Sequence, residues 1–275
     1  MDFVTRFAPS PTGRLHLGHV ASALQVWSAA QAMGGTVLLR IEDVDQGRCR
    51  ADYHAEILED LAWLGLTWPE PVRVQSNHFS AYTRVIEALE ARGLVYRCFR
   101  TRAEISELAG DRPFMGGPLA ERTVREKLEA GEAFAWRLSL AAAREALGAD
   151  WAALSYLEAT EPGGPPTRQR AEPERHGDVV LGRKDTPAAY HLASTHDDAL
   201  QGVTHIIRGT DLIDAPHIHR LIQVLMGWPE PVYSHHPVLL GSDGKKLSKR
   251  DGAESLAALR QLGLTAQDVR ARAGF

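Results

Sequence analysis

The 275-residue chain contains only two cysteines, Cys49 and Cys98. Two thiols allow at most one disulfide and cannot form a site with four thiolate ligands, so we expect both to be reduced. No apolar run approaches the ~20 residues that cross a bilayer, and the N-terminal MDFVTRFAPSP lacks the apolar core of a signal peptide. The sequence therefore predicts a cytoplasmic protein with no membrane partner.

An excess of positive charge is also missing. The net charge is −4 at pH 7, so any nucleic-acid partner would have to be bound by a local basic surface. The hydrophobic content of 44% and the charged content of 24% are ordinary for a globular protein. The length allows one large domain, or one domain with a substantial insertion.

Strand-like runs alternate with helical patterns along much of the chain. Residues 3–11 predict a strand that enters a turn, and a helix is expected from about Gly18. Residues 36–42 predict a buried strand, and helices are expected at 51–65 and 80–93. This alternation predicts an α/β fold, a Rossmann-like doubly wound parallel sheet with helices on both faces.

The alternation weakens in the middle of the chain and then resumes. Residues 161–177 are rich in proline and glycine, so a loop or linker is expected there. The predicted parts are a first half of the core at 1–98, an inserted α+β subdomain at 99–177, a second half of the core at 178–240, and a loop with short C-terminal helices at 241–275.

The first motif is RFAPSPTGRLHLGH, residues 6–19. His16 and His19 flank the start of the predicted helix, where the N-terminal end favours anions. Histidine can donate to phosphoryl oxygens, and Gly18 removes a Cβ where a nucleotide would approach. The motif suits a triphosphate, and a tight turn with two partly exposed histidines explains the four residues 16–19 equally well.

The second motif is LRIEDVD, residues 39–45. It places Glu42 at the carboxyl edge of a parallel sheet, where open α/β folds bind ligands and where it could accept from an ammonium group. Asp43 and Asp45 could contribute to a magnesium site or could cap and turn the chain. The structural role is favoured, because aspartate commonly caps and turns.

The third motif is GSDGKKLSKRDGAE, residues 241–254. Lys246, Lys249 and Arg250, on a loop flanked by glycines, can gather around the charge that develops as a phosphoanhydride breaks. A solvated basic turn is the alternative for this motif alone.

In their order, five blocks resemble a class I aminoacyl-tRNA synthetase of the glutamyl type: APSPTGRLHLGH, RIED, AAYHLA, HIIRGTDL and KLSKR. Residues 16–19 match the first signature of that class, and residues 246–250 match the second, with Leu247 and Arg250 departing from its commonest wording. The resemblance covers about residues 3–98 and 178–275 and is weaker between them.

The resemblance implies a set of site residues. L-glutamate would be bound by the residues matching Arg6, Ala8, Ser10, Glu42, Tyr190 and Arg208. ATP would be bound at His16, Gly18, His19 and Lys249, with Mg²⁺ bridging its phosphates, and Lys249, Lys246, His16 and His19 would be catalytic. The two arginines suit the two carboxylates of glutamate, and Glu42 suits its ammonium group.

The implied reaction has two steps. The α-carboxylate of glutamate attacks the α-phosphorus of ATP, and a nucleic-acid hydroxyl then attacks the glutamyl-adenylate. Only 25 residues follow Arg250, so no anticodon-binding domain is expected. This length resembles a truncated branch of the family whose members glutamylate queuosine in the anticodon loop of tRNA-Asp, and we expect a monomer. The alternatives are a shortened enzyme that charges a tRNA 3′ end, and a catalytically silent nucleotide- or RNA-binding relative.

The resemblance further implies an acceptor-binding-like insertion with a zinc site, which would begin with Cys-x-Cys and be completed by a downstream Tyr and Cys. This chain has Cys98-Phe99-Arg100 and no later cysteine. One thiolate cannot complete a tetrahedral zinc site, and Arg100 would repel the ion. We therefore expect no structural zinc, and we expect Cys98 to be a small core residue.

Overall fold

The N-terminal part of the chain forms a three-stranded parallel sheet in the computed structural model, which describes residues 2–239 and 254–275. The strands are β1 (Val4–Phe7), β2 (Thr36–Ile41) and β3 (Arg73–Val74), hydrogen-bonded in that order. Helix α1 (Leu17–Ala32) connects β1 to β2, α2 (Ala51–Trp63) connects β2 to β3, and α3 (Phe79–Ala91) follows a short turn of 3₁₀ helix (Gln75–His78). These elements agree with the predicted strand and helices of this region.

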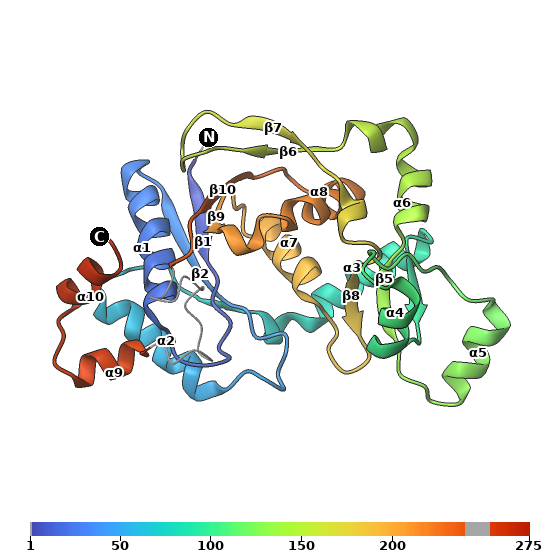
Figure 1. The fold of residues 1–275 in the computed structure, drawn as a ribbon, viewed down its shortest axis with the longest axis horizontal. Coiled ribbons are helices and arrows are strands. Elements are labelled where there is room, and N and C mark those ends of the chain that lie inside the picture. Colours follow the sequence, from blue (N-terminus) through green and yellow to red (C-terminus); the bar gives the residue numbers. More distant parts are fainter. Residues whose placement is uncertain (1, 240–253) are drawn as a thin grey trace.

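A second sheet has the strand order β7-β6-β10-β9. Its parallel strands are β6 (Ser155–Glu158), β9 (His205–Gly209) and β10 (Val232–His236), and β7 (Thr167–Arg170) is an antiparallel edge strand. The amide of Thr204, just before β9, donates to the carbonyl of Val4 in β1 at 2.9 Å, so the two sheets meet along β1 and β9. Helices α7 (Tyr190–Leu200) and α8 (Ala215–Met226) accompany this half (Figure 1). The predicted α/β fold with a parallel sheet is confirmed.

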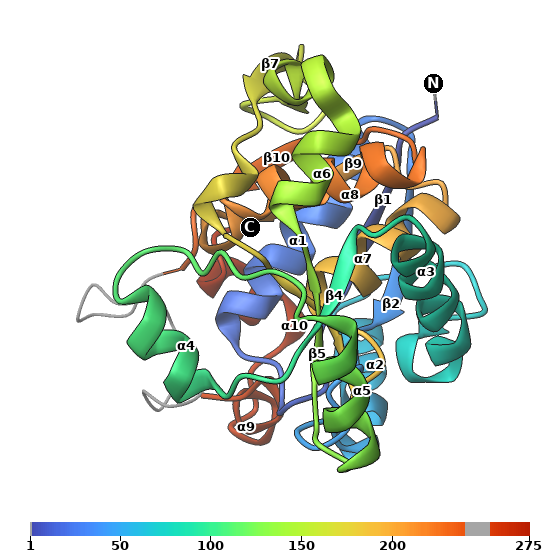
Figure 2. The same ribbon diagram turned by 90° about the vertical axis from the view of Figure 1, so that its right-hand side faces the viewer.

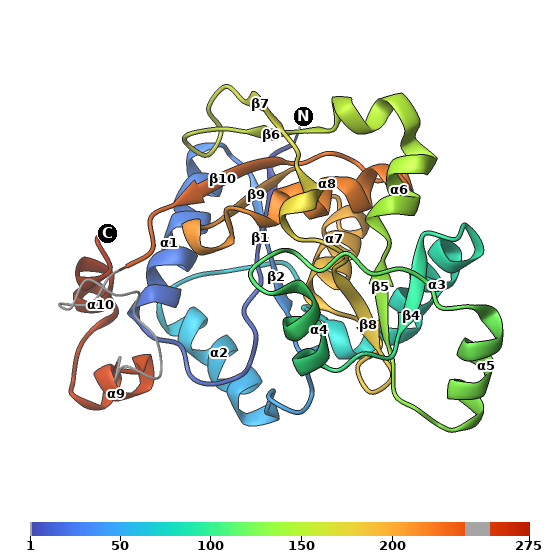
Figure 3. The ribbon, with the colours of Figure 1, turned by 45° about the vertical axis from the view of Figure 1, so that its right-hand side comes forward.

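The middle of the chain forms a separate antiparallel sheet with the order β4-β5-β8. Its strands are β4 (Val95–Cys98), β5 (Ala135–Leu138) and β8 (Val180–Arg183). Helices α4 (Arg102–Ala109), α5 (Glu121–Glu129) and α6 (Leu140–Leu147) and a 3₁₀ turn (Gly148–Ala153) complete this region. Figure 3 shows α5 on the opposite side of the molecule from the C-terminal helices, and Figure 2 views the molecule from the side of α5. No helix among the described residues has the length and apolar character needed to span a bilayer.

One local expectation was wrong. Residues 161–177 were expected to form a loop or linker, but they contain β7. Strand β6 lies within the range predicted as an insertion and pairs in parallel with β10, with Tyr233 opposite Glu158. For β7, pairing with β6 outweighs the weak strand propensity of residues 167–170, because strand formation depends strongly on context.

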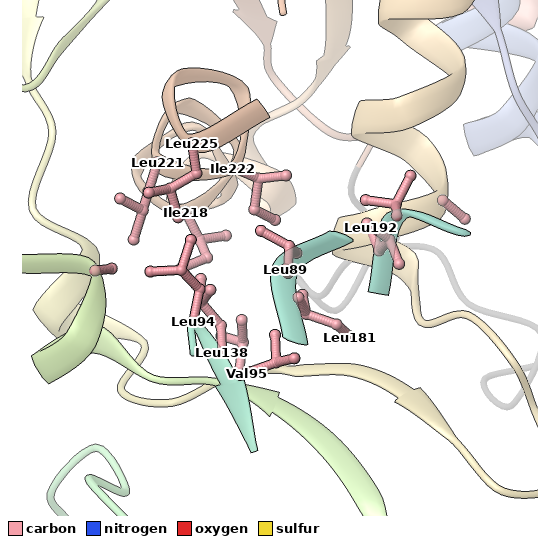
Figure 4. Close-up of a cluster of buried hydrophobic side chains, with 14 of the residues drawn as sticks. Leu89, Leu94, Val95, Leu138, Leu181, Leu192, Ile218, Leu221, Ile222 and Leu225 are labelled. Carbon is pink, nitrogen blue, oxygen red and sulfur yellow. The ribbon is translucent and has the colours of Figure 1, made fainter. Parts of the chain in front are cut away.

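The hydrophobic core has two parts. The larger one joins α3, the antiparallel sheet, α7 and α8 (Figure 4), through ten labelled side chains: Leu89, Leu94, Val95, Leu138, Leu181, Leu192, Ile218, Leu221, Ile222 and Leu225. The smaller part lies among β1, β2, α1 and α2 and includes Leu256 and Val269 of two short C-terminal helices, α9 (Leu256–Gln261) and α10 (Ala266–Arg272). The predicted C-terminal helices therefore pack against the core.

Candidate active site

A pocket of about 550 Å³ opens at the carboxyl edge of the parallel strands. Its lining comes from the residues at the ends of β1, β2, β9 and β10 and from the start of α1. This is the position at which open parallel sheets bind ligands, where two halves of the sheet meet. Every predicted site residue that the structure describes lies in this lining: Arg6, Ala8, Ser10, His16, Gly18, His19, Glu42, Tyr190 and Arg208.

The N-terminus of α1 forms part of the pocket lining. His16 is the N-cap residue, and its Nδ1 accepts from the amide of Gly18 at 3.1 Å. Nδ1 of His19 accepts from the amide of His16 at 3.2 Å, so the two imidazoles form a reciprocal capping box. Because both Nδ1 atoms accept, each neutral ring carries its proton on Nε2 and presents a donor there. Such donors at a helix N-terminus suit an anion such as phosphate.

The pocket lining also contains Arg208, a buried residue that is only 5% exposed. Its Nε donates to Nε2 of His235 at 3.2 Å, and its Nη1 donates to the hydroxyl of Tyr190 at 3.3 Å. The carbon of the guanidinium lies 5.1 Å from the ring centre of Tyr233. Nη2 is buried and has no hydrogen-bond partner among residues 2–239 and 254–275. A buried charged donor without a partner is costly, so this atom points to a missing acceptor such as a carboxylate.

A buried network of charges supports the pocket from behind. Arg40 is fully buried, and its guanidinium donates to Asp198 at 2.8 Å and to Glu42 at 2.9 Å. Asp198 also accepts from Nε of Arg6 at 3.0 Å. Burial raises the pKa of Glu42, and Arg40 and Arg6 oppose this shift. Arg6, Arg208 and Glu42 thus give the pocket lining two positive groups and one carboxylate. The network of Arg40 and Asp198 holds Arg6 and Glu42 in fixed positions.

Comparison with known proteins assigns the chain to a family. Residues 2–269 match the family of tRNA synthetases class I (E and Q), catalytic domain. The chain belongs to this class I tRNA synthetase family. A relative from Rhodobacter capsulatus, named glutamyl-Q tRNA(Asp) synthetase, is 42% identical over 99% of this chain and 100% of the relative. A protein of the same name from Burkholderia cenocepacia is 40% identical over 96% of this chain and 89% of its own length.

Among solved structures, this synthetase resembles a glutamate tRNA ligase from Elizabethkingia meningosepticum, determined in complex with its amino acid. The TM-score is 0.70 at 29% identity, over 92% of this chain and 53% of the ligase. The synthetase therefore spans about half the length of that ligase.

Two predicted catalytic residues of the synthetase, Lys246 and Lys249, lie outside the described residues. The site also contains residues that the motifs did not indicate: Arg40, Asp198, His235 and Glu158. Arg40 stands two positions before Glu42 in the LRIED motif, which was the one available local signal for it. The others come from distant parts of the chain.

The two aspartates of the second motif bond to other parts of the chain. Asp43 accepts from the amide and the hydroxyl of Ser76, at 2.8 and 2.6 Å. Asp45 accepts from Nε of Arg48 at 2.6 Å within the following turn. The first bond ties the end of β2 to the segment after β3, the second is local, and both side chains lie outside the pocket lining.

The surroundings of Cys98 do not suit the zinc ion that the family resemblance implies. Cys98 is buried, and the next side chain, Phe99, packs against Phe134 with 5.6 Å between ring centres. The ammonium group of Lys127 lies 5.5 Å from the centre of the Phe99 ring. Among the described residues, no group of three His, Cys, Asp or Glu side chains is placed to hold a metal ion. Aromatic rings and a cation thus lie around Phe99, next to Cys98, and none of these groups is a zinc ligand.

Proposed function

We propose that this synthetase activates L-glutamate with ATP and transfers the glutamyl group to a tRNA, the acceptor being the queuosine base in the anticodon loop of tRNA-Asp. The observation that carries the proposal is the buried Nη2 of Arg208, which lacks a partner among the described residues, in a pocket that also contains Arg6 and Glu42. That set complements an amino acid with two carboxylates and one ammonium group.

In the proposed complex, Arg208 and Arg6 bind the carboxylates of glutamate, and Glu42 accepts from its ammonium group. Tyr190 and Ser10 contribute hydroxyl groups, and Ala8 borders the substrate. The network of Arg40 and Asp198 holds Arg6 and Glu42 in place before the substrate arrives. Such preorganisation lowers the ordering cost of binding.

In the activation step, an oxygen of the substrate α-carboxylate forms a bond to the α-phosphorus of ATP. The bond from that phosphorus to the bridging oxygen breaks, and pyrophosphate leaves. His16 and His19 donate from Nε2 to phosphate oxygens, Gly18 allows close approach, and Lys249, assisted by Lys246, stabilises the developing charge. Mg²⁺ is expected to arrive on the phosphates of ATP and to neutralise part of their charge, since the described residues provide no cluster for it.

In the transfer step, a hydroxyl oxygen of queuosine attacks the carbonyl carbon of glutamyl-adenylate. The bond from that carbon to the phosphate oxygen breaks, and AMP leaves, while the hydroxyl proton passes to the departing phosphate or to water. The choice of this acceptor is supported by the names of the two relatives and by the match over 100% and 89% of their lengths. We further propose that the enzyme acts in the cytoplasm as a monomer.

Glutamate-dependent exchange of pyrophosphate into ATP tests the activation step. We expect exchange with L-glutamate in the absence of tRNA. Exchange that appears only when tRNA is added would favour a shortened enzyme that charges a tRNA 3′ end. No exchange under either condition would favour a catalytically silent relative.

Transfer of labelled glutamate tests the acceptor. The enzyme would be supplied with tRNA from cells with and without queuosine, and labelled tRNA would be separated by species. We expect label only on tRNA-Asp, and only when queuosine is present. Label that stays with the 3′-terminal adenosine after ribonuclease digestion in acidic buffer, instead of with the fragment that contains the anticodon loop, would refute the proposed acceptor.

A further inference from the structure

A row of three polar side chains crosses the second sheet, one from each of three neighbouring strands. Arg208 is on β9, His235 on β10 and Glu158 on β6. His235 stands directly opposite Arg208 in the strand register, and β6 lies on the other side of β10. Nε of Arg208 donates to Nε2 of His235 at 3.2 Å, and Nδ1 of His235 lies 2.8 Å from Oε1 of Glu158.

These contacts determine which ring nitrogen of His235 carries the proton. The Nε–H of arginine can only donate, so Nε2 of His235 must be an unprotonated acceptor. The proton of the neutral ring then lies on Nδ1 and is donated to the carboxylate of Glu158. Glu158 thereby favours the neutral tautomer of His235 whose Nε2 can accept from Arg208.

The row determines how the guanidinium of Arg208 is oriented. With Nε bonded to His235 and Nη1 bonded to Tyr190, the plane of the group is fixed from two sides. Nη2 is then the buried nitrogen that has no partner in the part of the chain that the structure describes. The side chain of His235 is 3% exposed and that of Glu158 is 23% exposed, so neither His235 nor its bond to Arg208 is open to water.

Charged and titratable groups face His235 from each neighbouring strand. Arg208 faces it from β9 and Glu158 from β6, while Tyr233 and His236 are its neighbours on β10. Burial and the positive charge of Arg208 lower the pKa of His235, and Glu158 opposes them. Neutral His235 is therefore the form present near pH 7.

We propose that Glu158 and His235 are positioning residues, which aim Nη2 of Arg208 at a carboxylate of the bound amino acid. The inference rests on the proposed function, because it takes Arg208 as a substrate-binding residue. Protonation of His235 in acid would place an N–H against the Nε–H of Arg208, and the two donors would repel. Affinity for glutamate should fall as that protonation occurs.

The first test compares Michaelis constants in glutamate-dependent pyrophosphate exchange. We expect His235→Phe to raise the KM for glutamate by about 10- to 100-fold, because a buried charged donor loses its partner. The KM for ATP should change by less than about twofold, since the nucleotide binds at the far end of the pocket in this proposal. His235→Gln offers both an acceptor and a donor, and it should restore most of the affinity.

The second test uses the pH profile of kcat/KM for glutamate. Glu158→Gln removes the carboxylate that favours protonated His235, so the pKa of His235 should fall. The part of the acid limb that is due to His235 should then move to lower pH. That part should disappear in His235→Gln, which cannot titrate. The titration of Glu42 and of the substrate is common to all variants and should remain. A merely structural role for these residues would leave the acid limb in place.

Glu230→Gln is the matched control for Glu158→Gln. Glu230 pairs with Arg168 and Arg220 at 3.3 and 3.5 Å, immediately before β10, and makes no contact with Arg208. It should leave the pH profile unchanged.

Folded His235→Phe with a glutamate KM within about twofold of the wild type would overturn the inference. If His235→Phe does not fold, the inference would be overturned by a Glu158→Gln enzyme whose pH profile of kcat/KM has the same acid limb as the wild type. Absence of exchange in the wild type would overturn the proposed function, and this inference with it.

Discussion

The residues proposed to bind glutamate and those proposed to bind phosphate are held in different ways. At the glutamate end, which is the group Arg6, Glu42 and Arg208, buried side chains hold one another through hydrogen-bonded charges from distant parts of the chain. At the phosphate end, which is the pair His16 and His19, the imidazoles are held by backbone amides within one turn of α1, and the backbone of His16 also bridges to Ser255. The first end depends on the assembled fold, and the second depends largely on a local helix cap.

Substitutions among Arg6, Glu42, Arg208 and their partners should therefore change both stability and ligand binding. Substitutions of His16 and His19 can change ligand binding alone. A buried ion pair that loses one partner leaves an uncompensated charge in the interior, which destabilises the whole fold. A helix cap can be replaced by another capping side chain with little loss of stability. Substitutions at the two ends should therefore differ in their effects on stability and on catalysis.

The largest effect is expected for Arg40→Met. Removing this guanidinium leaves Glu42 and Asp198 buried without their shared partner. The free energy of unfolding should fall by about 3–5 kcal/mol, measured by urea titration, and glutamate-dependent exchange should be lost as well. Arg14→Met is the control, since Arg14 forms an exposed pair with Glu56 and should change stability little. An Arg40→Met protein as stable as this control would show that the network is not a stabilising unit.

Lys249→Ala should slow adenylate formation by about 10²–10³-fold, as the loss of one preorganised charge partner often does. Because this lysine belongs to the predicted phosphate end, the free energy of unfolding should stay close to that of the wild type. Single-turnover kinetics and urea titration measure the two quantities. Lys127→Ala, in the middle region of the chain, serves as the control. Near-normal pyrophosphate exchange in Lys249→Ala would refute its role.

His16→Asn should separate capping from catalysis. Asparagine is a strong N-cap residue and can accept from the amide that Nδ1 of His16 now binds, but it has no counterpart of the Nε2 donor. We expect unchanged thermal stability and a fall of about 10- to 100-fold in adenylate formation. His16→Ala, which removes the cap as well, should also lower the unfolding temperature. Loss of stability in His16→Asn would show that the two ends are less different than proposed.

The smallest effect is expected for metal removal, which should change the stability of neither end of the site. Since the surroundings of Cys98 do not suit zinc, treatment with a chelator in the absence of ATP should shift the unfolding temperature by less than about 1 °C. One zinc per purified chain in elemental analysis would contradict this expectation.

Local patterns in the sequence were enough to predict the parts of the site that are locally built. His16 and His19 are spaced to cap a helix after a Pro- and Gly-rich turn, and Glu42 ends an apolar strand run. The parallel α/β fold followed from the same alternation of strand and helix. All these features depend on residues a few positions apart, whose relation is set by helix and strand periodicity.

The supporting residues could not be predicted, because their partners are far away along the chain. Arg40 and Asp198 are separated by 158 positions, and Glu158 and His235 by 77. Nothing in the local sequence of Asp198 or Glu158 indicates a partner, since pairing at such separations is decided by topology. Strand β7 was missed for a related reason: it depends on β6 beside it, with which residues 167–170 pair in register.

The position of β6 limits how this enzyme could be shortened by protein engineering. A minimal version that joined residue 98 directly to residue 178 would delete β6, although β6 is a strand of the same sheet as β9 and β10. Strand β10 would then become an open edge, a template for self-association. A trimmed enzyme would therefore have to retain residues 155–158, and the smallest working unit is discontinuous in the sequence.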